Sequence, residues 1–549
     1  MAERVEMPWW GWGDPEHSRE LPAAALAEIE RRFGKLADPE SLPGIDHFEI
    51  PESRVPEPVA AALRSSTGAD AVSDTPTSRV LRGGGKSYPD LVRMRAGRPA
   101  GLPDLVVAPA NAEEVSKVLK VCSESGTAVV PFGGGTSVVG GLSPIGEGQG
   151  GVISLDMSRM SGMVSIDEES RIGVVLGGTS GPEAEAAFAA HGLTIGHFPQ
   201  SFLHATVGGF VATRSAGQAS TGYGRIDSNV LGLEMVTPTG PISLPPMPGT
   251  AAGPGLRSLL VGSEGTLGVI TEVALQLSKA PAATLDRAWI VSGFEHGREL
   301  MRRMEQAGCA PAVARLSDEE ETAVSLALSA KSRARRAFAR YALSKGRGRP
   351  CLLITCFEGE RDRISGAHAD ASAILRSGGA KSLGGMPARA WRHGRYDGPY
   401  LRDVLMGRGL LVDTLETAAP WSKLEGLYSS VSDSLRGSLG RFGGDPIVMC
   451  HVSHLYPGGA SLYFTFVGIQ PGNNPDERIS NWWDVKSAAS EAISREGGTI
   501  THHHAVGTDH RPWMEAEVGE RSLAALAALK RELDPNGVMN PRKLLPDSG

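Results

Sequence analysis

The stretch VVPFGGGTSVVGG, residues 129–141, decides the fold expected of this chain. It places five glycines in thirteen positions directly after an apolar, β-branched run. Glycine loses more conformational entropy on folding than any other residue, so this density in one loop needs a cause. Consecutive glycines allow several backbone amides to converge on one anion, and Thr136 and Ser137 add hydroxyl donors. The loop therefore predicts a site for a phosphate-bearing ligand.

The residues before this loop predict a strand, a helix and a second strand. Residues 104–109 (DLVVAP) and 127–132 (TAVVPF) are apolar runs typical of strands. Between them, Asn111 with Glu114 three residues later is a helix-start signal, and Gly126 is a stop signal. The glycine loop then follows the second strand at once.

Three familiar kinds of glycine-rich turn match this loop less well. A dinucleotide-binding Gly-x-Gly-x-x-Gly turn leads into a helix, whereas TSVVGGLSP (136–144) is a poor helix start. A Gly-Lys-Ser/Thr phosphate loop needs a lysine that does not follow here. A purely structural turn rarely needs three successive glycines. Two more glycine-rich loops, residues 198–226 and 261–271, favour a large phosphate-bearing cofactor lying along backbone.

The pattern of the chain predicts an α+β fold in four segments. Short β-branched runs alternate with glycines up to about residue 280, after which Arg- and Ala-rich helical stretches mix with strands. We expect an N-terminal extension at 1–79, a first domain at 80–279, a second at 280–490, and a C-terminal segment at 491–549.

Composition argues against several classes of function. A net charge of −7 and an aromatic content of 5% disfavour nucleic-acid binding, and no apolar run approaches the length of a membrane span. The five cysteines never form a Cys-x-x-Cys pair, which indicates reduced thiols rather than disulfides or a zinc site. The first twenty residues lack the apolar core of a secretory peptide, so we expect a cytoplasmic protein.

The three glycine loops, in this order and spacing, resemble the FAD-binding domain of the vanillyl-alcohol-oxidase superfamily. The segments concerned are PFGGGTSVVGG (131–141), TVGGFVATRSAG (206–217) and GSEGTLGVIT (262–271), and DPNGVMNPRKLL (534–545) resembles the C-terminal return of many members. The resemblance implies a two-part FAD-binding domain with an inserted cap, an antiparallel sheet flanked by helices. The first loop has no histidine for a covalent bond, so we expect dissociable FAD. The implied cofactor-binding residues are Pro131, Phe132, Gly133, Gly134, Gly135, Thr136, Ser137, Pro199, Gln200, Ser201, Thr206, Gly208, Gly209, Thr213, Arg214, Ser215, Ala216, Glu264, Gly265, Thr266, Leu267, Gly268, Val269 and Ile270.

Three adjacent histidines, His502, His503 and His504, form the second unusual feature. In an extended segment side chains alternate between faces, so we expect His502 and His504 to converge and His503 to point away. That arrangement disfavours three ligands on one metal ion, and we expect no metal. A metal site and a surface cluster stay open as alternatives. Because imidazole titrates near working pH, acid–base and electrostatic work beside the flavin is the favoured role.

Within the superfamily, the chain is most similar to the alkyldihydroxyacetone-phosphate synthase family. The similarity rests on WWGWG (9–13), CAPAVARLSD (309–318), PYLRDVLMGRGLLVDTLETAAPW (399–421), GGASLYFTF (458–466) and HHHAVG (502–507). It implies catalytic roles for Tyr463, Arg315 and the three histidines, and substrate binding by Arg402. On pattern alone, the two arginines also fit ordinary ion pairs, and Tyr463 fits an apolar core.

The resemblance implies an exchange reaction of ether-lipid synthesis. The acyl group of acyl-dihydroxyacetone phosphate would be replaced by a fatty alcohol, through a transient covalent link between the substrate carbon and flavin N5, with no net redox change. The implied partners are a small lipid-phosphate substrate and a fatty alcohol. Peripheral membrane contact and a homodimer are left open.

Two other functions stay open from the sequence. A FAD-dependent dehydrogenase or oxidase of 2-hydroxy acids has the same fold, but such enzymes usually carry Gly-Glu-His-Gly, and His502 stands at the Glu position. His451 and His454 in MCHVSHLYPGG (449–459) could nonetheless seed a metal site. A non-catalytic flavin- or lipid-binding protein is disfavoured by the histidines and the paired arginines.

Overall fold

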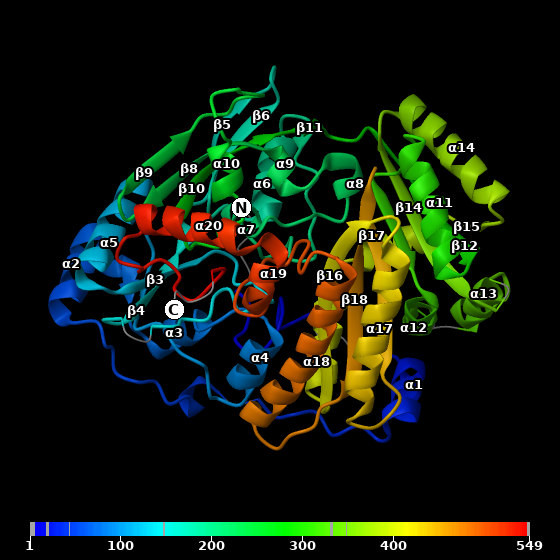
Figure 1. Ribbon diagram of the computed structural model, residues 1–549, viewed down its shortest axis with the longest axis horizontal. Helices are drawn as coiled ribbons and strands as arrows, with labels where there is room; N and C mark the ends of the chain where they lie inside the picture. The colour runs from blue at the N-terminus through cyan, green and yellow to red at the C-terminus, as the bar shows by residue number, and fades with distance from the viewer. Residues whose placement is uncertain are drawn as a thin grey trace.

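The chain forms an α+β structure of two lobes, seen side by side in Figure 1. The computed structural model describes residues 6–17, 21–42, 44–146, 149–329, 333–346 and 348–545. In the described residues, the first lobe contains a four-stranded sheet, a five-stranded sheet, a two-stranded pair and the C-terminal helices. The second lobe is built on one seven-stranded sheet.

The first sheet has the strand order β1-β2-β4-β3, with β4 parallel to β2 and to β3. Helix α5 (Ala112–Ser125) connects β2 to β3: the Asn111 side chain accepts a hydrogen bond from the Glu114 amide, and Gly126 ends the helix in the left-handed conformation, as the sequence predicts. The strands are β1 (Val72–Ser73), β2 (Leu105–Val107), β3 (Ala128–Phe132) and β4 (Val152–Asp156).

Part of the expected N-terminal extension belongs to this first lobe. Strand β1 pairs with β2, and helix α2 (Glu57–Thr67) packs on α5 through the fully buried Leu63 and Val118. Burial of apolar side chains of this size stabilises the fold by about 1.5–3 kcal/mol each. No structural boundary therefore lies at residue 79.

The second sheet of the first lobe is antiparallel, in the order β5-β6-β10-β8-β9. A separate pair, β7 with β11, lies beside it. The strands are β5 (Met163–Asp167), β6 (Ile172–Leu176), β7 (Leu193–Thr194), β8 (Val230–Thr237), β9 (Gly240–Leu244), β10 (Val269–Gln276) and β11 (Ser278–Lys279).

The second lobe is organised by an antiparallel sheet in the order β15-β12-β14-β13-β17-β18-β16. Its side chains alternate between two cores: Trp289 belongs to one face, and its neighbours Ala288 and Ile290 belong to the other. The strands are β12 (Ala283–Ser292), β13 (Val313–Ser317), β14 (Pro350–Gly359), β15 (Lys381–Gly384), β16 (Leu410–Pro420), β17 (Ile447–Tyr456) and β18 (Gly459–Ile469).

Helices cover both faces of the seven-stranded sheet. One face packs on α11 (Phe294–Gln306), α14 (Arg361–Ser377), α17 (Leu424–Gly440) and α18 (Pro475–Glu496). The other carries α12 (Glu319–Ser329), α13 (Arg333–Ser344) and α15 (Met386–Gly394). Helix α16 (Gly398–Met406) precedes β16. The boundary expected at residue 490 falls inside α18, which begins after the Asn474 cap and ends at Gly497.

The remaining helices lie mainly in the first lobe. They are α3 (Pro76–Leu81), α4 (Tyr88–Arg95), α6 (Gly181–Ala189), α7 (Val207–Thr213), α8 (Ser220–Tyr223), α9 (Ile226–Asn229) and α10 (Leu256–Leu260), with 3-10 turns at Ile45–His47, Ala69–Ala71, Met157–Arg159 and Arg511–Trp513. None of the helices in the described parts of the chain combines the length and apolarity needed to cross a bilayer.

The two ends of the chain tie the lobes together. Helix α1 (Ala23–Phe33) lies against the second lobe, where Arg32 pairs with Glu320 of α12 at 2.6 Å. At the other end, α19 (Met514–Val518) and α20 (Glu520–Leu533) cross the first lobe. The segment after α20 adds to the edge of β3, because the Val129 amide donates to Val538 O and the Asn540 amide donates to Val129 O, both at 2.8 Å.

Candidate active site

The glycines of the first loop let two loops approach each other. A Cβ on Gly134 would lie 2.2 Å from the His204 carbonyl oxygen, and one on Gly133 would lie 2.5 Å from Thr206 Oγ1. A Cβ on Gly208 would likewise lie 2.6 Å from the carbonyl oxygen of Gly177. Contacts under 3.0 Å with backbone leave no room for a side chain. Glycine is therefore required at Gly134 and Gly208 because backbone packs on backbone, and at Gly133 because the Thr206 hydroxyl lies against it.

The third loop is joined to the C-terminal segment through Glu264. Its two carboxylate oxygens accept hydrogen bonds from the amides of Val506 and Gly507 at 2.8 and 2.7 Å. Asn540 Nδ2 donates to the backbone carbonyl of Glu264 at 2.7 Å. Burial raises the pKa of Glu264 to about 7, against the effect of the two amides. This loop thus fixes the position of the segment that follows the histidines.

A cavity of about 520 Å³ lies between the two lobes and brings most of the expected residues together. Tyr463, Arg315, Arg402, His503 and His504 all line it. The expected cofactor residues that line it are Pro131, Gly133, Gly134, Gly135, Thr136, Ser137, Pro199, Gln200, Ser201, Thr206, Gly208, Gly209, Thr213, Ser215, Ala216, Glu264, Gly265, Gly268, Val269 and Ile270.

Four expected cofactor residues lie away from this cavity wall. Phe132 lies beneath the Arg82 guanidinium, whose carbon is 5.4 Å from the ring centroid. Arg214 pairs with Asp227 at 3.0 Å, and half of its side chain is exposed. Thr266 and Leu267 are buried. A motif match therefore selects the segment but not the orientation of each side chain within it.

Tyr463 lies at the centre of the site because of its place in β18. Its neighbours Leu462 and Phe464 are fully buried in the core of the second lobe, so the intervening side chain faces the cavity. Across the sheet Tyr463 is paired with His451 on one side and Glu416 on the other. Burial raises the pKa of the phenol to about 12, which keeps it protonated at neutral pH.

Two imidazoles hold the Tyr463 ring. His451 stacks on it with a centroid distance of 4.9 Å and an interplanar angle of 18°, and His503 does so at 5.8 Å and 19°. His504 meets the same ring edge-on at 5.5 Å. The tyrosine ring is thus fixed within reach of the cavity.

Glu416 anchors the backbone of the histidine strip. This fully buried carboxylate accepts hydrogen bonds from the amides of His502, His503 and His504, the last at 2.8 Å, and from Thr501 Oγ1 at 2.7 Å. Burial alone would raise the pKa of Glu416, but the adjacent imidazoles and the hydrogen bond from Thr501 hold it well below its usual value.

The expected alternation of the histidines is wrong. Three successive amides turn toward one carboxylate, so residues 502–504 form a bend and not an extended strand. His502 and His503 therefore converge, with their Nδ1 atoms 3.0 Å apart, and His503 faces the cavity instead of pointing away. Burial lowers the pKa of His502 and His503 to about 3 and that of His504 to about 4.

Arg315 belongs to a polar triad with the buried residues Glu321 and His451. Its guanidinium donates to Glu321 Oε1 at 2.5 Å and meets His451 Nε2 at 2.9 Å, and His451 Nδ1 is 3.2 Å from the same Glu321 oxygen. Burial would raise the pKa of Glu321, but the charges of Arg315 and His451 lower it to about 2. Arg315 is thus held in place on the same face as Tyr463.

Arg402 keeps part of its hydrogen-bonding capacity unused. Its Nη1 donates to the carbonyl of Lys86 at 2.8 Å, and its Nη2 is 3.4 Å from Asp403 Oδ1. Its Nε is buried without a hydrogen-bond partner among the described residues, although the residue lines the cavity. A buried donor without a partner is unfavourable, so a ligand acceptor here would stabilise the site.

Away from Tyr463 the cavity wall becomes apolar. Going two residues at a time along β18 and β17, the lining pairs are Tyr463–His451, Thr465–Met449 and Val467–Ile447. At a strand rise of about 3.3 Å per residue, the distance along β18 from Tyr463 to Val467 is about 13 Å. Other apolar side chains also line the cavity: Leu21, Ala25, Ile29, Val324, Ala327, Leu328, Leu401, Leu405 and Val412.

Comparison with known proteins identifies the family. Residues 103–243 match the FAD binding domain model, and residues 288–544 match the model of FAD linked oxidases, C-terminal domain. The alkyldihydroxyacetonephosphate synthase of Trypanosoma brucei brucei is 32% identical, over 98% of this chain and 92% of its own length. A solved structure of an alkyldihydroxyacetonephosphate synthase matches with a TM-score of 0.85 and 27% identity, over 98% of this chain and 99% of that chain. This chain belongs to the alkyldihydroxyacetonephosphate synthase family.

The oxidoreductase relatives of this synthase family are more distant. The mitochondrial D-lactate dehydrogenase [cytochrome] of Arabidopsis thaliana is 29% identical over 82% of this chain and 74% of its own length. Both resemblances inferred from the sequence, to the FAD-binding superfamily and to the synthase family within it, are confirmed. The cofactor is FAD.

The residues of this family member fit FAD. The part of the cavity formed by the first two glycine loops is lined by glycines and by hydroxyl residues, and the arginines that line the described cavity, Arg315 and Arg402, both come from the second lobe. A pyrophosphate would thus be held by backbone amides and hydroxyls. Gln200 Nε2 and Gln218 Oε1 are buried cavity-lining atoms without a partner among the described residues, and a polar cofactor would satisfy them.

Sequence reasoning missed several residues of the site. Glu416 holds the histidine strip and Glu321 holds Arg315, yet neither was expected to act. The sequence did carry a signal for Glu416. A glutamate inside the apolar run LLVDTLETAAP (410–420) must find buried hydrogen-bond partners. The apolar lining supplied by Ala25 and Ile29 had no such signal, since helix α1 reaches the site only through tertiary packing.

Proposed function

We propose that this protein exchanges the acyl group of acyl-dihydroxyacetone phosphate for a fatty alcohol. The observation that carries the proposal is the continuity of the cavity: it runs from the glycine loops, past Tyr463, to an apolar end. An alkyl chain of a lipid substrate needs such an end, whereas a small 2-hydroxy acid does not. Each CH₂ group transferred to this lining is worth about 0.8 kcal/mol.

The polar groups are placed to hold the other end of the substrate. Arg402, with its unpartnered Nε, would bind the phosphate, and a guanidinium offers the planar set of donors that a phosphate accepts. Arg315, held by Glu321, would stabilise negative charge that develops beside Tyr463. These two arginines are therefore assigned to the substrate and not to the cofactor.

Tyr463 and the histidines are assigned to proton movement. The phenol, protonated at neutral pH, would donate a proton to the departing carboxylate and then accept one from the incoming alcohol. In the exchange the substrate carbon loses its bond to the carboxylate oxygen and gains one to the alcohol oxygen, so no electron acceptor is needed. Bound FAD would supply the nucleophilic atom that holds the substrate carbon between these two events.

The experiment that tests this function separates it from hydroxy-acid oxidation. Purified holoprotein is incubated without oxygen or another electron acceptor, either with acyl-dihydroxyacetone phosphate and a fatty alcohol or with a panel of 2-hydroxy acids. We expect fatty acid release in the first case and no bleaching of the flavin absorbance in the second. Bleaching by a hydroxy acid, without fatty acid release from the lipid, would establish the dehydrogenase instead.

The compartment and the assembly of the protein are separate proposals. We infer a cytoplasmic enzyme. Its substrates, small lipid phosphates and fatty alcohols, would be taken up at a bilayer surface, because the cavity has an apolar end. Co-sedimentation with phospholipid vesicles would test the membrane contact. Analytical ultracentrifugation would test the homodimer.

A further inference from the structure

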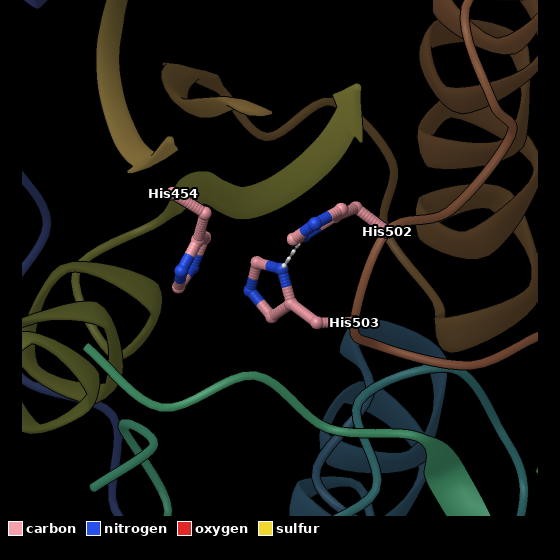
Figure 2. A group of neighbouring side chains, drawn as sticks. All are labelled: His454, His502 and His503. Carbon is pink, nitrogen blue, oxygen red and sulfur yellow. Dashed lines mark hydrogen bonds between the residues drawn. The ribbon is translucent and has the colours of Figure 1, made fainter. Parts of the chain in front are cut away.

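We propose that His454, His502 and His503 form a binding site for one divalent transition-metal ion of the zinc class, at the wall of the cavity. The proposed exchange reaction does not need this site. The proposal rests on the geometry of the three imidazoles, shown in Figure 2.

The three imidazoles converge from two distant segments of the chain. Each offers a ring nitrogen, and these nitrogens all lie within 4.8 Å of one another. His502 Nδ1 and His503 Nδ1 are 3.0 Å apart, close to the separation of about 3.3 Å between two nitrogens on one tetrahedral zinc ion. Among the residues that the structure describes, this is the group of His, Cys, Asp and Glu side chains that converges in this way. In Figure 2 the ring of His503 lies between the other two.

Neighbouring hydroxyl groups orient two of the rings as in a metal site. Ser220 Oγ is 2.5 Å from His454 Nδ1, and Tyr456 Oη is 2.7 Å from His502 Nε2. Each hydroxyl can accept the N–H of its imidazole, which leaves the other ring nitrogen with a free lone pair. Metal-binding histidines almost always have such a partner on the non-ligating nitrogen.

The charges around the cluster favour a cation. Arg225 is close, since it donates to the His502 carbonyl at 2.9 Å, but it also pairs with Asp227 at 3.0 Å. Glu416 is fully buried, and the Nδ1 atoms of His503 and His504 each lie 3.7 Å from one of its carboxylate oxygens. A buried carboxylate beside the imidazole cluster is stabilised by a bound cation.

The donor set defines the kind of ion and what it does. Three imidazole nitrogens suit zinc, cobalt, nickel or copper, whereas magnesium and calcium need oxygen ligands. His454 and His503 line the cavity, so the fourth coordination position opens toward it. A bound ion would hold His503 in place beside Tyr463 and occupy its ring nitrogen. Because the histidines are assigned to proton movement, zinc should inhibit the exchange reaction.

The test measures binding directly. FAD-loaded full-length protein is freed of metals with a mild chelator and titrated with Zn²⁺ by calorimetry, with Co²⁺ as a second probe by visible absorption beyond the flavin bands. We expect one ion per chain, and binding at least about tenfold weaker for His454→Gln and for Ser220→Ala. His197→Gln is the matched control, because His197 is also buried and meets a serine, Ser215, at 2.8 Å, but lies outside the cluster. Its zinc affinity should equal that of the wild type.

Each outcome decides the proposal. Stoichiometric binding that both cluster variants weaken and the control leaves unchanged supports it, as does a zinc inhibition constant that rises in parallel. Absence of saturable binding at one ion per chain overturns it. Equal affinity in the wild type, Ser220→Ala and any folded His454→Gln protein also overturns it. Ser220→Ala keeps all three imidazoles, so it decides the question even if the other variant does not fold.

Discussion

The backbone amide of His504 donates a hydrogen bond of 2.8 Å to the buried carboxylate of Glu416. The two residues are far apart in sequence, yet this contact and its equivalents at His502 and His503 determine how the strip bends. Glu416 also lies opposite Tyr463 in the sheet. One carboxylate thus links the position of the histidines to that of the tyrosine.

Replacing Glu416 by Gln should reduce the exchange activity by about 10²-fold. The amide NH₂ of glutamine cannot accept the hydrogen bonds that the second carboxylate oxygen accepts, so the histidine strip should shift. A misplacement of catalytic groups by about 1 Å lowers the rate by about 10²-fold. The matched control is Asp413→Asn in the same strand, because Asp413 accepts from Trp482 Nε1 at 2.8 Å and does not touch the strip. Steady-state kinetics on both variants checks this. An active Glu416→Gln enzyme would show that the anchor is dispensable.

Replacing Tyr463 by Phe should lower the exchange rate by about 10²–10⁴-fold, the usual loss for a proton-transfer group, with FAD still bound. The ring and its stacking with His451 are kept, so only the hydroxyl is lost. Tyr428→Phe is the control: Tyr428 is also largely buried, but its hydroxyl donates to Asp318 at 3.2 Å. Rates with flavin absorbance measured on the same samples distinguish chemistry from cofactor loss. Unchanged turnover would remove Tyr463 from the catalytic residues.

Replacing Gly134 by Ala should prevent FAD uptake. The new Cβ would lie 2.2 Å from the His204 carbonyl and separate the first two loops. Gly366→Ala is the control, since a Cβ there meets nothing within 4 Å in helix α14, and this change should stabilise the protein by about 0.5–1 kcal/mol. Fluorescence titration of apoprotein with FAD measures the effect. Normal FAD affinity of Gly134→Ala would contradict the loop packing described above.

The FAD should dissociate from the denatured polypeptide. The sequence of the first glycine loop, residues 129–141, contains no histidine that could bond to the flavin. Precipitation with acid should therefore leave the yellow colour in the supernatant. Flavin that stays with the pellet would show a covalent bond from a residue elsewhere.

Asp509 should make stability depend on pH. Burial raises its pKa from 3.8 to about 7, and its Oδ2 has no hydrogen-bond partner among the described residues. The folded state therefore binds a proton more tightly than the unfolded state. This contribution to the unfolding free energy is complete below about pH 4 and is lost as pH rises through about 7. Chemical unfolding of Asp509→Asn should show a flatter pH profile and higher stability than the wild type at about pH 8; parallel profiles would refute the assignment.

Much of the fold could be predicted because its signals are local. The Asn111 cap, the Gly126 stop and the apolar alternation around Tyr463 each depend on residues a few positions apart. The glycine loops were also predicted as a ligand site, and they line the cavity. The close approach of Gly134 to the His204 carbonyl was not foreseen, because the sequence does not show which other backbone lies beside it.

The parts that could not be predicted depend on contacts distant in sequence. His503 faces the cavity because Glu416, from strand β16, bends the strip. His454 joins the cluster because β17 runs beside the C-terminal segment. The prediction assumed that the side chains of residues 502–504 alternate as in an extended chain. The hydrogen bonds from their amides to the buried Glu416 carboxylate bend the segment instead. No periodicity in residues 502–504 could have shown this.

The measurement that tests the central claim most directly is the balance of the exchange in a closed system. Holoprotein, acyl-dihydroxyacetone phosphate and a labelled fatty alcohol are combined without any electron acceptor. The account predicts one fatty acid released for each labelled alcohol incorporated into the dihydroxyacetone phosphate product, over many turnovers and with the flavin oxidised at the end. Release of fatty acid without incorporation of the alcohol, or a reaction that stops until an electron acceptor is added, would contradict it.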